Sequence, residues 1–326
     1  GSTKIYSILA LLFIYWICFK ILYSKTFLQN VFQTQIPHSS PRVSKMTQRR
    51  QWIKDTCQDL GKEIGLFEFR ERKGVKTSVR QIINGDNFIR ETKTKTIYCF
   101  AHKVATSSMF YIYSHIQNDS KFLHEIKMKK KIAFMIKFKL SLPSKDVRRL
   151  SSSHYTYLIH RHPYERLISG YLDRIVNNNC SYQAKETYEG VYKKKLNGTC
   201  IPKIPSFVQF VRLIIEQERI SASYINDHWR PIYNLCSPCL IDFDGIYKMD
   251  EIKELLKESG MNKSFWEKIP KFNEKKGSSI QKPIRLYYSK LSCVDLNKLR
   301  KVYELDFKLF QYDDTEYFDI CQDIHK

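Results

Sequence analysis

The chain has 326 residues and is 43% apolar, so it is long enough to bury one sizeable core. No shift in composition along it argues for two separate globular domains. Its formal net charge of +22 would suggest nucleic acid as the partner of a soluble nuclear protein. An apolar segment near the N-terminus indicates a membrane instead, so we expect no nucleic acid but an anionic nucleotide, a polyanionic glycan, or both.

The first predicted element is a membrane anchor. Residues 5–23 are almost wholly apolar apart from Lys20, and at about 1.5 Å per residue they span about 28 Å, close to the hydrocarbon core of a bilayer. A cleaved secretory signal peptide is the alternative, but no small-x-small cleavage site follows. We therefore expect a short cytoplasmic tail at 1–4, a transmembrane signal anchor at 5–23 and a stem at 24–52, which is polar, basic and without periodicity.

Glycosylation signals and cysteines favour a luminal domain at 53–326. Acceptor triplets for N-glycosylation begin at Asn118, Asn197 and Asn262. Apart from Cys18 in the apolar segment, eight cysteines remain, an even number that is compatible with disulfides in an oxidising compartment. Their pairing cannot be read from their spacing.

The segment Cys236-Ser237-Pro238-Cys239 has the two-residue gap of a redox motif or of half a zinc site. No second Cys or His pair of matching spacing accompanies it. We therefore expect both cysteines to form structural disulfides, and we expect no metal.

Strand and helix patterns alternate along the rest of the chain. Strand signals lie at 94–101 and 154–160, and helical patterns lie at 108–118, 163–177, 206–219, 250–258 and 294–310. This alternation predicts the α/β class, as a single domain with a central parallel sheet flanked by helices. Ligands of such sheets bind at the carboxyl ends of the strands.

The strand at 94–101 runs into a turn that carries one lysine and three hydroxyl groups. Helical spacing of apolar residues begins directly afterwards, at Met109. Such a turn offers backbone N–H groups, a helix N-terminus and an ammonium group to a bound anion. The predicted anion-binding residues of this turn are His102, Lys103, Val104, Ala105, Thr106, Ser107 and Ser108.

A second turn follows the strand at 154–160. Arg161 ends the strand, Pro163 suits the first turn of a helix, and apolar residues then recur at four-residue steps from Leu167. This turn holds a second anion, and a nucleoside with phosphate at both ends, such as the sulfuryl donor 3'-phosphoadenylyl sulfate, would fit the pair. The predicted residues of the second turn are Arg161, His162, Pro163, Tyr164, Glu165, Arg166, Leu167, Ile168 and Ser169. For Arg166 a purely structural role is the alternative, because it points away from the helix face that Leu167 and Tyr171 share.

Four segments in the same order resemble the Golgi carbohydrate sulfotransferases, specifically the family with the chondroitin and dermatan 4-O-sulfotransferases and the glucuronyl 3-O-sulfotransferase of the natural-killer carbohydrate epitope. The turns at 96–108 and 155–169 are similar to its 5'-phosphosulfate and 3'-phosphate binding motifs. The segment at 226–244 resembles its His-Trp and Cys-x-Pro-Cys region, and 303–310 resembles its C-terminal helix. The resemblance implies a P-loop-like sulfotransferase fold in a single-pass type II Golgi membrane protein.

Site roles follow from this resemblance. Lys103 would contact the 5'-phosphosulfate and stabilise the leaving phosphate oxygen, and Arg161 and Ser169 would bind the 3'-phosphate. His228 is the candidate general base, beside an aromatic Trp229 that can stack on a sugar, and His102 and Glu165 are its rivals.

The chain departs from the family pattern at three places. Ser107-Ser108 stand where Thr with Asn or another polar residue is common. His102 stands where proline is usual, and His162 stands where an acidic residue is usual.

The acceptor implied by the resemblance is an anionic glycan, either chondroitin or dermatan or a glycan that ends in glucuronic acid. A nucleotide kinase is a rival class, but the chain has no G-x-x-x-x-G-K-[ST] and the first turn contains no glycine. The remaining alternative is a membrane-tethered basic glycan-binding protein whose catalytic activity has lapsed.

Overall fold

The computed structural model describes residues 44–64, 69–72, 75–78, 83, 85–118, 135, 137–138, 140–259 and 281–321. The predicted tail, the predicted anchor and the stem up to residue 43 lie outside these ranges. Within them, no helix combines the length and the apolar character that a membrane span requires. The chain from Ser44 onward forms one compact unit.

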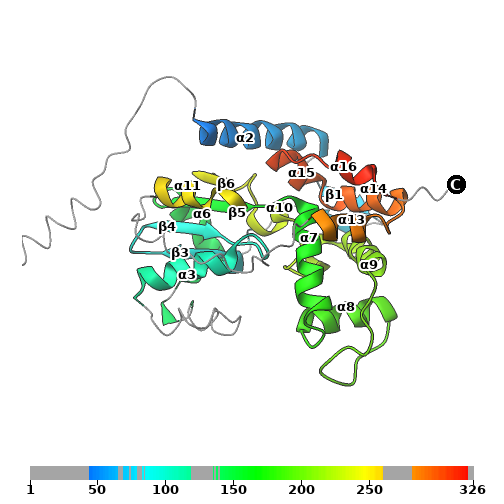
Figure 1. Cartoon of the computed structure of the whole chain (residues 1–326). Coiled ribbons are helices and arrows are strands. Elements are labelled where there is room, and N and C mark those ends of the chain that lie inside the picture. The colour runs from blue at the N-terminus through cyan, green and yellow to red at the C-terminus, as the bar shows by residue number, and fades with distance from the viewer. Residues whose placement is uncertain are drawn as a thin grey trace, which may run out of the picture. The chain divides into compact units, whose positions relative to one another are not determined.

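This unit contains a four-stranded sheet with the order β3-β4-β5-β6, beside which the helices α7 (Pro163–Tyr171), α8 (Tyr182–Tyr192) and α9 (Phe207–Ile220) lie (Figure 1). Its strands are β3 (Phe88–Glu91), β4 (Thr96–Cys99), β5 (Tyr155–His160) and β6 (Gly245–Lys248). Strands β4, β5 and β6 are parallel, as predicted, whereas β3 runs antiparallel to β4. The prediction of a wholly parallel sheet is therefore wrong at this edge, because a four-residue turn joins β3 to β4 and a parallel connection needs a dozen or more residues.

A second, two-stranded sheet is separate from the central one. It consists of β1 (Phe69–Arg72) and β2 (Val75–Ser78), which pair antiparallel. Sequence reasoning did not predict it.

Helices occupy each of the five predicted positions. They are α3 (Thr106–Ile116), α7 (Pro163–Tyr171) with its π-helical continuation η2 (Leu172–Val176), α9 (Phe207–Ile220), α11 (Ile252–Glu258), α14 (Cys293–Val302) and α15 (Glu304–Phe310). The last two come from a single predicted helix, which is interrupted at Tyr303. Unpredicted helices are α2 (Lys45–Ile64), α6 (Ser144–Ser151), α8 (Tyr182–Tyr192), α10 (Ile232–Cys236), α13 (Gln281–Tyr288) and α16 (Thr315–Phe318), with short 3-10 turns η1 (Gly85–Asn87), η3 (Ala222–Tyr224) and η4 (Met249–Glu251).

Helix α2 begins at Lys45, ahead of the boundary at 53 that the sequence predicts for the folded domain. Arg49 donates to the carbonyl oxygen of Ile246 at 2.9 Å and pairs with Glu251, and the indole N–H of Trp52 donates to the carbonyl of Lys308. These bonds hold the helix on the domain. Residues 45–52 of this helix are polar and basic, which explains why the sequence predicts them to be part of a stem.

Two hydrophobic clusters make up the core. The first surrounds the sheet and includes Val104 of the turn after β4, together with Ile112 of α3. The second is formed by helices and includes Leu167 and Ile168 of α7, together with Trp229. Residues of the two predicted anion turns thus pack in different clusters.

Four disulfides join the eight cysteines that follow the apolar segment. Cys236 bonds to Cys99 at the end of β4, and Cys239 bonds to Cys57 of α2. The other two pairs are Cys180 with Cys200 and Cys293 with Cys321. The expectation that Cys236 and Cys239 are structural is confirmed, and each of them bonds to a different element.

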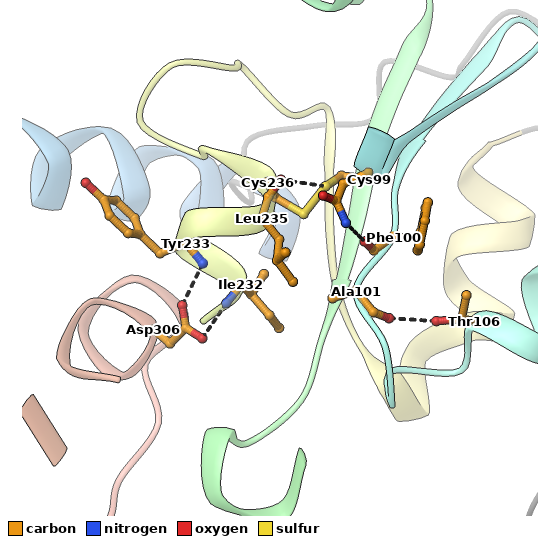
Figure 2. The surroundings of a disulfide bond; sticks show 10 residues. Cys99, Phe100, Ala101, Thr106, Ile232, Tyr233, Leu235, Cys236 and Asp306 are labelled. Carbon is orange, nitrogen blue, oxygen red and sulfur yellow. Dashed lines mark hydrogen bonds between the residues drawn. A yellow bond between two sulfur atoms is a disulfide. The ribbon is translucent and has the colours of Figure 1, made fainter. Parts of the chain in front are cut away.

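The Cys99–Cys236 disulfide connects the end of β4, just before the first turn, to helix α10 (Figure 2). On the far side of α10, the carboxylate of Asp306 accepts the backbone N–H groups of Ile232 and Tyr233, both at 2.7 Å, and so caps the helix. Burial raises the pKa of Asp306 to about 6, although these two hydrogen bonds act in the opposite direction. Helix α10 is therefore fixed at both ends, one of them directly beside the turn.

Candidate functional site

The turn after β4 has the backbone of an anion-binding loop without glycine. Lys103 and Ala105 have φ values of 69° and 62°, in the left-handed region, and the Thr106 hydroxyl closes the turn by donating to the carbonyl of Ala101 at 2.6 Å (Figure 2). Helix α3 starts directly afterwards, and its N-cap residue, Ala105, makes no side-chain capping bond. The first-turn N–H groups of any helix lack intrahelical acceptors, so this end favours an anion.

The Lys103 side chain is largely buried, with 16% of its surface exposed, and its ammonium lies 3.1 Å from the carboxylate of Asp173 on η2. Burial lowers the pKa of Lys103, an effect that Asp173 opposes and that Arg174 and Arg161 reinforce. A buried ammonium whose counterion is a half-exposed carboxylate can exchange that carboxylate for a ligand phosphate.

Arg161 follows β5 and lies at the start of α7. Its Nε donates to the Glu165 carboxylate at 3.0 Å, one helical turn away. Its two terminal NH2 groups have no hydrogen-bond partner within the described ranges. The guanidinium is thus oriented by Glu165 and keeps a fork of donors for a phosphate. Ser169 is half-buried and lies four residues beyond Glu165, on the same face of α7.

The two turns lie at the same edge of the sheet. Strands β4 and β5 are adjacent and parallel, so their carboxyl ends are neighbours. Helix α7 passes directly over the first turn at Gly170: a Cβ added there would lie 4.0 Å from the Cγ of Lys103 and 3.5 Å from the carbonyl oxygen of His228. The structure therefore brings together Lys103, the Arg161 helix and the His228 segment.

Arg166 occupies a structural position, which is the alternative that the sequence leaves open for it. It is 1% exposed, and its guanidinium donates to the carbonyl oxygens of His102, Asp227 and Arg230 at 2.8, 3.1 and 2.6 Å. The N–H groups of the Arg166 guanidinium thus connect the first turn to the segment that contains His228. Arg166 is therefore a structural link between the three parts of the site.

Other residues of the two predicted sets point into the core. The side chains of Val104, Tyr164, Leu167 and Ile168 are fully buried in the hydrophobic clusters. Such residues can offer a ligand only their backbone. The Thr106 hydroxyl is likewise used within its own turn.

His162 takes over the helix-capping role of a short acidic residue. Its Nδ1 accepts the backbone N–H of Tyr164 at 3.2 Å, and its Nε2 lies 2.9 Å from the carbonyl oxygen of Asp313, to which it donates. Burial lowers the pKa of His162 and so favours this neutral ring. The departure at this position leaves the start of α7 capped.

His228 is 5% exposed, and its ring lies flat against His102, with 3.8 Å between the ring centroids. Burial lowers its pKa to about 3, with Arg174, Arg166 and Lys103 acting in the same direction and Asp173 against it. His102 stands where the family pattern has proline. Its ring provides a flat surface on which His228 stacks, beside Lys103. Of the rival bases, Glu165 is already engaged by Arg161.

The buried histidines make stability depend on pH. Burial lowers the pKa of His160 and His228 to about 3, whereas an unfolded imidazole titrates near 6.5. The unfolded chain then binds more protons, so the free energy of unfolding should fall as the pH drops below about 6.5, by up to about 1.4 kcal/mol per pH unit for each histidine. Because the pKa of Asp306 is raised, its contribution to the free energy of unfolding increases as the pH falls from about 6 to 3.8. Over this range it offsets the contribution of one histidine.

Urea denaturation at about pH 7.5 and about pH 5 measures this slope. The substitution His160→Phe removes one of the two histidines and should flatten it. A free energy of unfolding that stays constant over this range would show that the folded protein accepts the protons.

Sequence reasoning missed several residues of the site. Asp173 pairs with Lys103, and Arg174 lies on the same π-helical turn. Glu186 of α8 accepts a hydrogen bond from Asn226, which in turn contacts His228. Asn226 belongs to the quoted Asn-Asp-His-Trp segment, but no spacing in the sequence points to Asp173 or Glu186. In the part of the chain that the structure describes, no group of three or more His, Cys, Asp or Glu side chains is arranged to hold a metal ion.

The sequence model of the sulfotransferase family matches residues 86–313, which include both turns and the His228 segment. The chain is 28% identical over 184 residues to carbohydrate sulfotransferase 12 of Xenopus laevis, a match that covers 52% of this chain and 43% of that protein. It is 22% identical over 283 residues to carbohydrate sulfotransferase 11 of Rattus norvegicus, covering 82% and 76%, and 24% identical over 249 residues to carbohydrate sulfotransferase 14 of Danio rerio, covering 73% and 63%. The first match thus spans less than half of the Xenopus protein. No solved structure matches the chain.

Proposed function

Since the chain belongs to the sulfotransferase family, we propose that this enzyme transfers a sulfuryl group from 3'-phosphoadenylyl sulfate to a hydroxyl group of a carbohydrate. The observation that carries the proposal is the meeting of Lys103 and the Arg161 helix at the ends of two adjacent parallel strands. A nucleotide with phosphate groups on both its 3' and 5' oxygens needs two such cationic sites on one edge.

The described residues fit such a donor. Lys103 and the N-terminus of α3 would hold the 5'-phosphosulfate, and Lys103 would stabilise the charge that develops on the leaving phosphate oxygen. The terminal NH2 groups of Arg161 and the Ser169 hydroxyl would hold the 3'-phosphate. Asp173 would release Lys103 when the donor binds.

In the transfer step, the acceptor hydroxyl oxygen forms a bond to sulfur while the bond between sulfur and the bridging phosphate oxygen breaks. The bonding pair leaves with adenosine 3',5'-bisphosphate. The acceptor's proton passes to the Nε2 of His228, which is buried and has no hydrogen-bond partner within the described ranges. His228 would thus act as the general base.

The proposed acceptor is an anionic glycan: a glycosaminoglycan of the chondroitin or dermatan type, or a glycoprotein glycan that ends in glucuronic acid. The relatives are named carbohydrate sulfotransferases, and the high positive charge of the chain suits a polyanionic acceptor. The sugar and the hydroxyl position depend on loops that the motifs do not specify.

We further propose that the enzyme is a single-pass type II protein of the Golgi membrane with its catalytic domain in the lumen. The apolar segment at 5–23 and the four disulfides support this location. Protease treatment of sealed microsomes should leave the catalytic domain intact; digestion without detergent would place the domain on the cytoplasmic side.

A transfer assay tests the proposed reaction. The purified protein is incubated with 35S-labelled donor and a panel of desulfated chondroitin, desulfated dermatan and glucuronyl-terminated glycans. We expect label in at least one glycan. Retention on immobilised adenosine 3',5'-bisphosphate without transfer to any of these acceptors would favour a lapsed enzyme, and an absence of both would exclude the proposed donor site.

A further inference from the structure

A chain of three side chains leads from helix α8 to His228. The Nδ2 of Asn226 donates to the Oε2 of Glu186 at 2.6 Å. The Oδ1 of Asn226 lies 3.1 Å from the backbone nitrogen of His228 and 3.0 Å from its Nδ1. Both ends of the Asn226 amide are therefore engaged, one by a carboxylate and the other by the histidine.

These contacts decide where the His228 proton lies. A backbone N–H can only donate, so the Asn226 atom that faces it must be the amide oxygen. The opposite end is then the NH2 group, which is the correct partner for the Glu186 carboxylate. Since the amide oxygen can only accept, the Nδ1 of His228 carries the ring proton and its Nε2 is bare.

The bare Nε2 is buried and has no hydrogen-bond partner within the described residues. The groups that face His228 are the cations Lys103, Arg166 and Arg174, the carboxylate of Asp173 and the flat ring of His102. The cations and burial keep the imidazole neutral, so Nε2 remains an acceptor. A polyanionic donor bound at Lys103 would offset those cations and make Nε2 more basic in the complex.

We propose that Asn226 and Glu186 are positioning residues, which hold His228 in the tautomer whose Nε2 takes the proton of the acceptor hydroxyl. This inference rests on the proposed function. In the transfer step the hydroxyl proton binds Nε2, and the resulting imidazolium keeps its Nδ1 proton on the amide oxygen of Asn226. Asn226 and Glu186 thus act through His228.

The local backbone makes Asn226 a rigid support. Its carbonyl oxygen accepts the N–H groups of Trp229 and Arg230 at 2.9 and 2.8 Å, so the whole turn closes on this one residue. Burial raises the pKa of Glu186, and its bond to Asn226 opposes that shift. The carboxylate thus lies in a partly buried position where its hydrogen bond orients the amide.

The decisive experiment moves the carboxylate one step closer to His228. The double variant Glu186→Gln/Asn226→Asp keeps the number of hydrogen bonds and the total charge, because the new glutamine NH2 donates to the new aspartate. The aspartate then faces Nδ1 and stabilises the imidazolium, which raises the pKa of His228. The acid limb of the pH profile of kcat should therefore move to higher pH by about one to three units. A purely structural pair would leave the pH profile in place, and an unchanged profile would overturn the proposal.

Single variants separate positioning from folding. Asn226→Ala frees the ring to adopt the other tautomer and should lower kcat about 10²-fold with the KM for the donor unchanged. Glu186→Ala should lower kcat less, and Glu186→Gln, which keeps an acceptor for the amide, should restore it. Asn178→Ala, at an exposed position outside the site, is the matched control. An Asn226→Ala variant that is retained on immobilised adenosine 3',5'-bisphosphate and keeps full kcat would also overturn the proposal.

A measurement without turnover keeps the inference separate from the proposed reaction. Long-range 1H–15N spectra of protein with 15N-labelled histidine report which ring nitrogen carries the proton, and His228→Gln identifies the resonance. We expect a bare Nε2 in the wild-type protein and a mixture of tautomers in Asn226→Ala. If the His228 ring of the wild type carries its proton on Nε2, the positioning role of Asn226 and Glu186 is excluded, even if the enzyme is active. If Nε2 carries no proton but the protein transfers no sulfate, the proposed reaction is wrong and the inferred tautomer of His228 is correct.

Discussion

Replacement of Lys103 by alanine should lower turnover about 10²- to 10³-fold and leave the protein folded. The ammonium is the proposed stabiliser of the leaving oxygen, and it lies in a buried position where water screens it little. Its counterion in the free protein, Asp173, is half-exposed, so water can solvate that carboxylate after the substitution. The measurement is kcat with labelled donor at saturating acceptor.

Lys193→Ala is the matched control for Lys103→Ala, because Lys193 is also paired with a carboxylate, that of Glu216, but is exposed and lies at the end of α8. We expect its kcat to equal that of the wild type. If Lys103→Ala and Lys193→Ala have the same kcat, the ammonium of Lys103 takes no part in the transfer.

Removal of the Cys99–Cys236 disulfide should lower stability strongly. The two cysteines are 137 residues apart, and loss of a cross-link over so long a loop costs about 2–5 kcal/mol of unfolding free energy. The bond also fixes the end of β4, from which the Lys103 turn starts. The double variant Cys99→Ser/Cys236→Ser should therefore lose both stability in urea and retention on immobilised adenosine 3',5'-bisphosphate.

The Cys180–Cys200 disulfide is the control for this effect. It closes a loop of only 20 residues, so the variant Cys180→Ser/Cys200→Ser should lose less stability and keep its retention. Equal losses in the two double variants would mean that the position of the Cys99–Cys236 bond beside the turn does not matter.

The local part of the site could be predicted from the sequence because short-range chemistry determines it. The run of β-branched and aromatic residues before His102 and the proline at 163 place a strand, a turn and a helix with little help from the rest of the chain. Parallel pairing of the two strands then brings the turns to one edge. The same reasoning located α9 and the helices at 294–310.

Contacts over long sequence distances could not be predicted. The role of Arg166 depends on carbonyl groups of residues 102, 227 and 230, and a helix pattern does not show which carbonyls a guanidinium reaches. The pairing of Lys103 with Asp173 depends on a π-helical turn, which has no sequence signal.

The proposal that one nucleotide spans both turns is tested most directly by equilibrium binding of three nucleotides to three proteins. Adenosine 3',5'-bisphosphate, 5'-AMP and 3'-AMP are titrated into the wild type, Lys103→Ala and Arg161→Ala. We expect Arg161→Ala to weaken the binding of the bisphosphate and of 3'-AMP by about 10- to 100-fold and to leave the binding of 5'-AMP unchanged. We expect Lys103→Ala to weaken the binding of the bisphosphate and of 5'-AMP and to leave the binding of 3'-AMP unchanged. If both variants weaken all three nucleotides equally, or if the bisphosphate does not bind the wild type, one nucleotide does not bridge Lys103 and Arg161.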